Sequence, residues 1–472
     1  MKDTLKNIFY NGIYQLVIIV LPLLTVPYVS RVLGAQKMGI NSLVNSIPIL
    51  LTTVILFGMN QLGVKTIAQS KFAERRKNFV QLWLIQAIIG LVTIILFITI
   101  TTTFSKYARY YLLEVPFLIG SLIDISWYFV GIGQIKKVIV RNSIIKLIIV
   151  SSIFLLVRTK DDLWIYLLIN SVTYLANIIF WISIKKEFGT IFKRKEFVLN
   201  KSLFISAVTV AIPTIAAQLY ISFDQTLVGW IAGAKQLSYY ALTQQMARAF
   251  ITLIGSVSTV LMPKMASIIV DRNSNNSLVP LLKKSLNYTM LGSCLIVSLI
   301  VPNAKLFVTW FWGNTYEPMA LDMSIGCLII IFVSVGGVFA NQYTLSRGLY
   351  RTFATPYYVG AIISLSMNLT LVPHLKSLGG TITIVLTELV VCVMRVVLVR
   401  KELPIGNLLK SNINYITSGL IAIIIGYLIP NFSNNQFILL VGKGSIILSC
   451  YFLLLLFMQD EFFTDIRSLI RK

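Results

Sequence analysis

The sequence predicts an all-α integral membrane protein that crosses the bilayer about fourteen times. Charged residues make up 12% of the 472 residues and apolar residues 57%, whereas an ordinary soluble protein is about 25% charged. Apolar runs long enough to cross roughly 30 Å of hydrocarbon recur from Ile8 to Met458. These runs are expected to be helices, because a backbone in lipid must satisfy its own hydrogen bonds.

The basic residues indicate which connections face the cytoplasm. With a cytoplasmic N-terminus, 28 of the 41 lysines and arginines fall in inside connections and nine in outside ones, as the positive-inside rule predicts. The formal net charge of +24 then reflects topology and attraction to anionic lipids rather than nucleic-acid binding. The spans are expected at residues 8–30, 40–64, 80–104, 108–131, 138–157, 162–183, 202–228, 238–263, 285–302, 319–345, 353–373, 378–399, 412–429 and 436–458.

A long basic connection from Lys185 to Lys201 predicts the boundary between two six-helix lobes. We expect the lobes at residues 1–190 and 191–401, followed by two further helices and a cytoplasmic tail at residues 402–472. A shift of 199 residues indicates an internal repeat, since it aligns Gly34 with Gly233 without gaps. Because the shift covers six helices, the repeats are parallel in the membrane, which is one of the recurring plans of secondary transporters.

Residues for catalysis or metal binding are scarce. The chain has one histidine, His374, near an expected outer helix end, and it lacks HEXXH, GxSxG and P-loop patterns. Its four cysteines each stand alone in an apolar run, which favours buried small side chains over a disulfide or a metal site. The sequence therefore predicts that the protein is not an enzyme and that it has no catalytic residue, metal or cofactor.

Ionisable residues within the expected spans are the informative exceptions. Each costs roughly 2.5–3.5 kcal/mol at a helix centre, so each should face protein or water and have a partner. These residues are Asp124, Lys146, Asp224, Arg248, Glu388, Arg395 and Lys443. Two interpretations remain open: the groups line a cavity, or they form structural ion pairs between helices. Glu388 and Arg395 lie on one helix face about 10 Å apart, too far for direct contact.

Polar neighbours of these charges favour a cavity. Helical spacing places Gln244, Arg248 and Thr252 on one side of the span at 238–263. Gln218 accompanies Asp224 on the preceding span. We therefore expect a hydrophilic cavity between the two lobes.

A second polar face supports the same cavity, and the cations indicate what it binds. The residues that share this face are Asp124, Trp127, Gly131 and Gln134. Lysine and arginine along such a cavity favour an anionic solute, and guanidinium suits phosphate because its donors match the oxygens in pairs.

Four segments resemble the oligosaccharide (Wzx-type) flippases of the polysaccharide transporter family. This family belongs to the multidrug/oligosaccharidyl-lipid/polysaccharide exporter superfamily. The segments are LPLLTVPYVSRVLGAQKMGINS (Leu21–Ser42), IDISWYFVGIGQIKKVIVRNSIIKL (Ile123–Leu147), FDQTLVGWIAGAKQLSYYALTQQMAR (Phe223–Arg248) and LMPKMAS (Leu261–Ser267). One departure is Gln134, where members of the family often carry Glu.

The resemblance implies two six-helix lobes around a central cavity, two further helices and transport by alternating access. Its implied substrate is an undecaprenyl-pyrophosphate-linked oligosaccharide repeat unit, which is flipped across the bacterial cytoplasmic membrane for capsule or exopolysaccharide synthesis. The implied partners are this lipid-linked oligosaccharide, membrane lipids, and a polysaccharide polymerase and glycosyltransferases of the same pathway. Both chain termini are expected to be cytoplasmic.

The charges and the resemblance together suggest roles for nine residues. The substrate-cavity candidates are Arg248, Arg31, Lys146, Gln244 and Gln218, with Arg248 expected to attract the pyrophosphate. The candidates for counter-charges or coupling sites are Asp124, Asp224, Glu388 and Arg395. An ion-coupled multidrug exporter on the same fold is the alternative, although it would favour an acidic cavity. A membrane-embedded glycan polymerase or acyltransferase would need a larger outer loop or a catalytic histidine.

Overall fold

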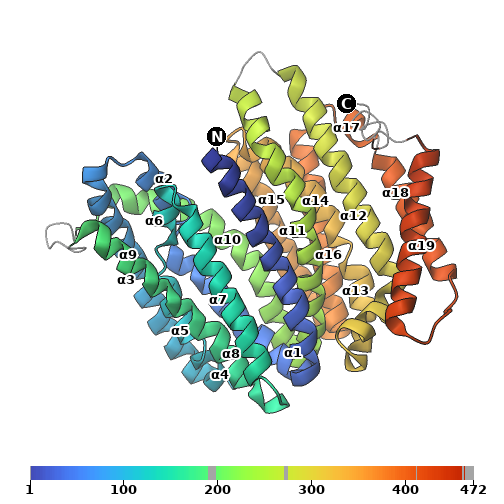
Figure 1. Ribbon diagram of the computed structural model, residues 1–472, viewed down its shortest axis with the longest axis horizontal. Helices are drawn as coiled ribbons and strands as arrows, with labels where there is room; N and C mark the ends of the chain where they lie inside the picture. Colours follow the sequence, from blue (N-terminus) through green and yellow to red (C-terminus); the bar gives the residue numbers. More distant parts are fainter. Residues whose placement is uncertain (1, 190–197, 271–274, 411, 460–461, 463–472) are drawn as a thin grey trace. The chain divides into compact units, whose positions relative to one another are not determined.

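The structure, a computed structural model, consists of helices joined by short connections (Figure 1). It describes residues 2–189, 198–270, 275–410, 412–459 and 462, with side chains for all of these except 2–20, 217, 220, 221, 256–270, 275–277 and 350. These ranges contain no β-strand, and eleven of their helical stretches are long and apolar enough to cross a membrane. The predicted all-α membrane fold is confirmed.

Two pairs of predicted spans meet at a glycine. α1 (Lys2–Leu56) contains the first two spans and leaves helical geometry at Gly34, where φ is 74°. α10 (Lys201–Ala232) and α11 (Ala234–Val270) hold the seventh and eighth spans and meet at Gly233, where φ is 87°. Such angles favour glycine because they bring a Cβ atom against the backbone. These two glycines are the pair that the 199-residue shift aligns.

The described chain divides into two compact units, and the first is Met1–Thr226. In this unit α1 packs against three later helices, which are α3 (Phe72–Phe104), α5 (Val115–Leu122) and α7 (Ile135–Leu156). The remaining helices before α10 are α2 (Leu62–Gln69), α4 (Ala108–Leu112), α6 (Ser126–Gly131), α8 (Leu163–Val172) and α9 (Ile178–Phe188). An aromatic core built on Phe79, Trp127, Tyr128 and Phe180 holds α3, α6 and α9 together.

The second compact unit is Leu227–Lys472. Its helices after α11 are α12 (Asn275–Phe311), α13 (Ala320–Gly326), α14 (Ile329–Gly337), α15 (Tyr350–Leu375), α16 (Ser377–Val399), α17 (Ile405–Lys410), α18 (Asn412–Leu428) and α19 (Gln436–Phe457). A 3-10 segment, η4 (Asn314–Met319), precedes α13, and a π-helical segment, η5 (Val338–Leu345), follows α14. The last two predicted spans correspond to α18 and α19, which pack against each other and against α12 (Figure 1).

The boundary between the two compact units does not coincide with the predicted boundary between the lobes. The contacts group most of α10 with the preceding helices, so the division falls at Thr226 rather than in the basic connection at 185–201. Residues 190–197 of that connection lie outside the described part of the chain. The lobes at 1–190 and 191–401 and the appendix at 402–472 stay predictions.

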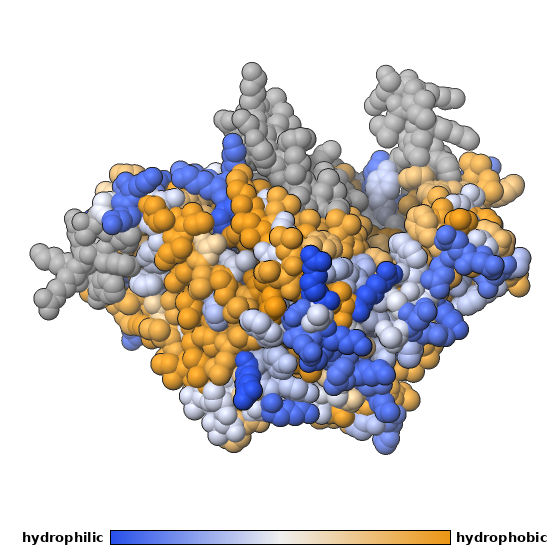
Figure 2. Space-filling view, turned by 60° about the horizontal axis from the view of Figure 1, so that its bottom comes forward, coloured by the Kyte–Doolittle hydropathy of each residue, from blue (hydrophilic) through white to orange (hydrophobic). Residues whose placement is uncertain are grey.

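Much of the surface of these helices is apolar. Large apolar side chains are exposed on three helices of the predicted spans, and examples are Leu91, Ile95 and Leu96 on α3, Ile144 and Leu155 on α7, and Leu420 and Ile424 on α18. Figure 2 shows broad apolar areas in orange beside smaller hydrophilic areas. A surface of this kind would be unfavourable in water and suits lipid. The chain is a multi-pass membrane protein.

Candidate functional site

The span at 108–131 is interrupted beside Asp124, between α5 and α6. An interrupted helix frees carbonyl oxygens that lipid cannot satisfy. Buried Gln86 on α3 meets this need, since its Nε2 donates to the carbonyl oxygens of Ser121, Leu122 and Asp124 at 3.1, 2.9 and 2.9 Å. The Oε1 of Gln86 accepts from the indole N–H of Trp127 at 3.1 Å.

Two further side chains complete this bonding. Asn177 Nδ2 donates to the carbonyl oxygen of Gly120, and Trp181 Nε1 donates to that of Ile123, each at 2.8 Å. Five consecutive carbonyl oxygens, from residue 120 to residue 124, thus accept from side chains of other helices. The interruption in the first unit is fixed by uncharged hydrogen bonds.

Asp124 serves this interruption directly. Its Oδ1 accepts from the backbone N–H of Ser126 at 2.8 Å, which forms an Asx turn at the start of α6, and its carboxylate interacts electrostatically with Arg141. The predicted polar face from Asp124 to Gln134 is wrong, because the helix does not continue through Asp124. Trp127 is buried in the aromatic core and Gln134 is an exposed residue at the start of α7.

In the second unit, α14 continues directly into the π-helical segment η5, so the helical stretch there is not interrupted. Arg395 on α16, 7% exposed, lies against Gly336 in the turn before η5, where an added Cβ would come within 3.0 Å of its guanidinium. The same guanidinium stacks over the ring of Tyr357 on α15 at 4.8 Å. Glu388, about two turns before Arg395 on the same face of α16, forms no ion pair with Arg395 or with any other described residue.

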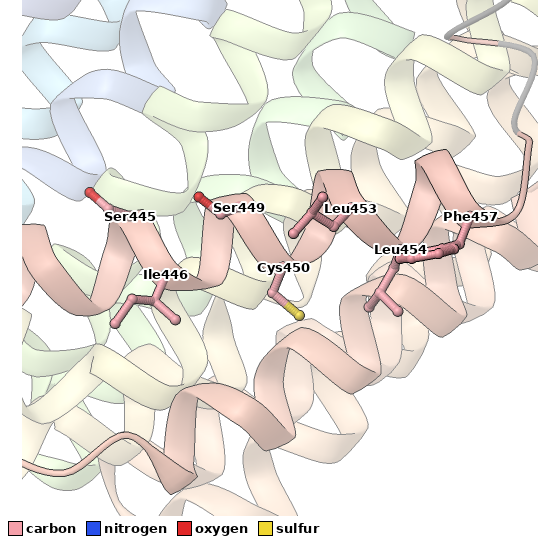
Figure 3. A pocket seen from close by; sticks show the side chains of 7 residues that line it. All are labelled: Ser445, Ile446, Ser449, Cys450, Leu453, Leu454 and Phe457. Carbon is pink, nitrogen blue, oxygen red and sulfur yellow. The ribbon is translucent and has the colours of Figure 1, made fainter.

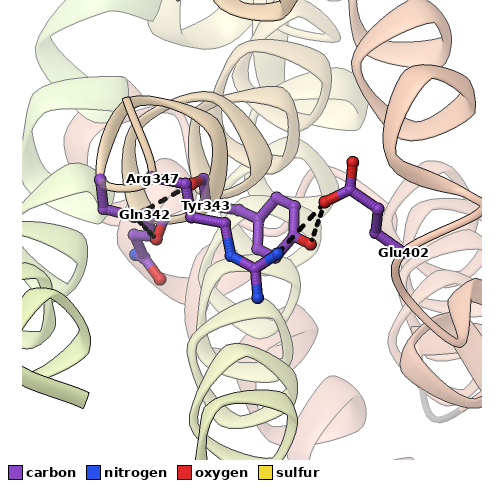
Figure 4. A network of polar contacts seen from close by, with 5 residues as sticks. Gln342, Tyr343, Arg347 and Glu402 are labelled. Atoms are coloured by element: carbon purple, nitrogen blue, oxygen red, sulfur yellow. Dashed lines mark hydrogen bonds and ion pairs between the residues drawn. The ribbon is translucent and has the colours of Figure 1, made fainter. Parts of the chain in front are cut away.

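A tyrosine–glutamate pair accompanies each of these stretches: Tyr343 lies within η5, and Tyr128 lies in α6, just after Asp124. In the second unit the hydroxyl of Tyr343 donates to Glu402 Oε2 at 2.8 Å, and Arg347 reaches the same oxygen at 3.2 Å (Figure 4). In the first unit the hydroxyl of Tyr128 donates to Glu187 Oε1 at 2.6 Å. The two residues of each pair are 59 positions apart, and the two pairs are offset by 343 − 128 = 215 residues rather than by the 199 residues that align Gly34 with Gly233.

On the predicted polar side of α11, the side chains become more exposed along the helix from Gln244 to Thr252. Gln244 is 2% exposed, and neither Nε2 nor Oε1 has a hydrogen-bond partner among the described residues. Arg248 is half-buried and Thr252 is exposed one and two turns further on. Arg248 is therefore a partly accessible charged residue one helical turn from the buried amide of Gln244.

The candidates on α10 and α1 lie in the first unit. Asp224 is 3% exposed, whereas Gln218 is half-buried and donates from Nε2 to Ser222 Oγ at 2.7 Å. Arg31 on α1 is exposed and Lys146 on α7 is half-buried. No ion pair joins Asp124 to Lys146, both of which have described side chains. The functional roles suggested for all nine residues stay predictions.

A groove of about 450 Å³ lies along α19 in the second unit. Its lining residues are Ser445, Ile446, Ser449, Cys450, Leu453, Leu454 and Phe457 (Figure 3). Apart from two serines the lining is apolar, so the groove suits an apolar chain better than a polar headgroup. The sequence predicts Cys450 to be a buried small side chain in an apolar span, whereas it is only partly buried and lines this groove.

Two buried carboxylates were missed by the sequence reasoning. Glu114, 1% exposed, is the N-cap residue immediately before α5, and no described residue hydrogen-bonds its Oε1. Asp322, 3% exposed on α13, accepts from Thr381 Oγ1 at 2.8 Å and from Ser377 Oγ at 3.2 Å. Both lie within the predicted spans 108–131 and 319–345, and that position is the signal that could have found them.

Comparison with known proteins extends these observations. The family profile described as "Polysaccharide biosynthesis protein" matches residues 4–269. A protein assigned as an O-antigen transporter of Escherichia coli is 24% identical over 405 residues, which are 84% of this chain and 97% of that protein. Among solved structures, the inward closed form of the lipid II flippase MurJ matches with a TM-score of 0.73 and 14% identity over 96% of this chain and 98% of that one.

An inward-facing multidrug resistance transporter of the MATE family also matches, with a TM-score of 0.61 and 14% identity over 84% of this chain and 99% of that one. At these identities the structural matches show a shared fold. The family match is of another kind, since it rests on sequence over more than half of the chain. The chain belongs to the polysaccharide biosynthesis protein family.

Proposed function

We propose that the protein is a flippase that translocates undecaprenyl-pyrophosphate-linked oligosaccharide repeat units across the bacterial cytoplasmic membrane. It works by alternating access and supplies capsule or exopolysaccharide synthesis. The observation that carries this proposal is the family membership together with O-antigen transporter relatives that match over most of their length. The substrate is moved rather than chemically changed, so the protein is not an enzyme.

The basic candidates give the proposal its chemistry. Arg248 is half-buried beside the hydrogen-bonding groups of Gln244, where a guanidinium is partly shielded from water and attracts a pyrophosphate more strongly. Arg31 and Lys146 are weaker sites for the same anion. Asp124, Asp224, Glu388 and Arg395 act as counter-charges or coupling sites.

The lipid part of the substrate has a different requirement. An undecaprenyl chain is too apolar to cross a hydrophilic cavity, so it stays in the bilayer beside the apolar helix surfaces. The groove on α19 offers such a surface in the second unit. The protein works alongside membrane lipids and with the polysaccharide polymerase and glycosyltransferases of its pathway, and both of its termini face the cytoplasm.

Deleting the gene and restoring variants of Arg248 tests the proposal. Deletion should leave the single lipid-linked repeat unit in the cytoplasmic leaflet and remove the surface polysaccharide. At matched protein levels, Arg248→Ala should reduce export about tenfold or more, since hydrogen bonds to charged groups contribute most, and Arg248→Lys should retain part of it. Arg351→Ala, at an exposed arginine, is the control. Full export by Arg248→Ala would contradict the role of this residue.

An ion-coupled multidrug exporter is the second candidate. The match to multidrug resistance transporters of the MATE family favours it, and the buried carboxylates of Asp224 and Glu388 could bind a cation. Drug resistance conferred by the protein, without any change in surface polysaccharide after deletion, would establish this candidate over the flippase.

A further inference from the structure

A small pocket in the first unit lies where α1 ends against α10. We name it the carboxamide pocket, and its lining residues are Thr53, Leu56, Gly58, Asn60, Gln61, Thr214 and Gln218. Its volume is about 290 Å³, close to the lower limit of about 300 Å³ for small-molecule sites. The pocket therefore has room for one small ring rather than for a whole lipid-linked oligosaccharide.

An unusual backbone bend forms one wall of the pocket. The predicted span 40–64 ends early at Leu56, because Phe57 and Gly58 adopt φ angles of 42° and 77°. A bulky residue with positive φ is strained and is retained only where its surroundings require it, as at ligand sites. Gly58 lies so close to α10 that an added Cβ would be 3.2 Å from the backbone nitrogen of Ala211.

The same bend is held in place by an aromatic contact. The ring of Phe57 stacks on Phe204 of α10, with 6.1 Å between the ring centroids. Shortly after the bend, two consecutive carboxamide residues, Asn60 and Gln61, line the pocket together with Gln218 of α10.

The polar side chains that line the pocket are uncharged, and two of its three carboxamides make no hydrogen bond to a described residue. The side chains of Asn60 and Gln61 make no hydrogen bond to a described residue, whereas Gln218 uses Nε2 to bind Ser222. Each free carboxamide offers both a donor and an acceptor. Adjacent sugar hydroxyls need the same combination, whereas a pyrophosphate or a cation would need charges that this lining lacks.

We propose that the carboxamide pocket binds an uncharged sugar ring of the lipid-linked substrate. This proposal rests on the flippase function and assigns the glycan to a place separate from the basic residues that attract the pyrophosphate. Asn60 and Gln61 hydrogen-bond the ring hydroxyls, Gln218 accepts from them through Oε1, and Leu56 covers one face of the ring. The positive-inside topology puts this end of α1 toward the cytoplasm, where the substrate enters.

The test compares two lipids that differ in their sugar. The first is undecaprenyl pyrophosphate, and the second is the lipid-linked repeat unit isolated from the gene-deletion strain. The full-length purified protein should bind the glycan-bearing lipid about tenfold more tightly than the bare lipid. The double variant Asn60→Ala/Gln61→Ala should lose this difference and keep the wild-type affinity for the bare lipid. Both residues are exposed, so folding should be preserved.

Gln69→Ala is the matched control, because Gln69 is also an exposed carboxamide but lies on α2 outside the pocket. It should bind both lipids as the wild type does. The proposal is overturned if the double variant keeps the full preference for the glycan-bearing lipid, or if it loses affinity for both lipids equally. Equal binding of both lipids by the wild type would also overturn it while leaving the flippase function intact. Binding of neither lipid would refute the flippase function itself.

Discussion

The stretch around Asp124 in the first unit and η5 in the second occupy equivalent places but differ in their polar chemistry. Each has a tyrosine within or just after it, and that tyrosine binds a glutamate 59 positions later. In the first unit, Gln86, Asn177 and Trp181 satisfy the freed carbonyl oxygens. In the second, Arg395 lies beside η5, and its Nε has no hydrogen-bond partner among the described residues.

This difference in hydrogen bonding indicates which stretch keeps one conformation and which can change its conformation. A fully satisfied buried network fixes one conformation, because every alternative breaks hydrogen bonds. A buried guanidinium with an uncommitted donor holds its present position less strongly, and π-helical segments often occur at functional sites. We therefore assign rigidity to the interrupted span of the first unit and adaptability to the second.

Removing Gln86 should produce the largest effect. Gln86→Leu leaves three carbonyl oxygens and the Trp127 indole without their partner, and should lower the free energy of unfolding by about 3–5 kcal/mol. Arg395→Met should cost far less, because replacing a buried charge by an apolar side chain is often neutral. Thermal unfolding in detergent measures both, with Gln69→Leu, at an exposed glutamine of α2, as the control. Similar losses for Gln86 and Arg395 would remove the distinction between the two stretches.

The glycines beside each stretch give the next largest difference. A Cβ at Gly120 would lie 2.6–2.7 Å from Tyr174 Cβ and backbone, whereas the nearest neighbours of a Cβ at Gly336 would be the flexible Arg395 side chain at 3.0 Å and Cys392 Cα at 3.5 Å. Gly120→Ala should therefore cost about 2–3 kcal/mol of unfolding free energy, and Gly336→Ala less than about 1 kcal/mol. Chemical denaturation of both variants measures this, and the reverse order would contradict the assignment of rigidity.

The two tyrosines should differ more modestly. Tyr128→Phe removes a 2.6 Å hydrogen bond to half-buried Glu187 and should cost about 2 kcal/mol. Tyr343→Phe should cost about 1 kcal/mol, because Glu402 is 46% exposed and keeps its contact with Arg347. Thermal unfolding of the two variants measures both losses of unfolding free energy. Equal losses would show that the contact of Arg347 with Glu402 does not compensate for the missing tyrosine hydroxyl.

Replacing Arg347 should have the smallest effect. Arg347→Met removes a partly exposed ion pair and a cation–π contact with Tyr343, at 4.5 Å. We expect a loss of about 0.5–1 kcal/mol, since exposed pairs contribute little. The loss should shrink in high salt because solvent ions screen the pair. A loss above about 2 kcal/mol that is independent of salt would show a buried interaction instead.

The sequence predicted those features that depend on the pattern of residues along one segment. Apolar length predicted the spans, and the 199-residue shift found Gly34 and Gly233 because both carry the same backbone requirement. The interruption before Asp124 was not predictable, since the residue that satisfies it, Gln86, lies on another helix. The sequence therefore suggests a counter-charge or coupling role for Asp124 but does not indicate the Asx turn that the structure shows.

In the candidate site, too, the sequence does not reveal features that depend on packing between distant segments. Spacing alone placed Gln244, Arg248 and Thr252 on one side of a helix, but only packing reveals that exposure increases along that side. Gln218 was singled out from its neighbours, whereas Asn60 and Gln61 were not, because the bend at Phe57 that presents them lies within a predicted span. Non-local packing decides which polar groups remain available.

Reconstitution into vesicles tests the central claim most directly. The purified protein is placed in vesicles with the isolated lipid-linked repeat unit, and an added glycosidase reports how much glycan reaches the outer leaflet. We predict that the protein makes the glycan on the inner leaflet accessible much faster than in protein-free vesicles, with the repeat unit otherwise unchanged. Accessibility no faster than in protein-free vesicles, or conversion into longer glycans, would contradict a flippase.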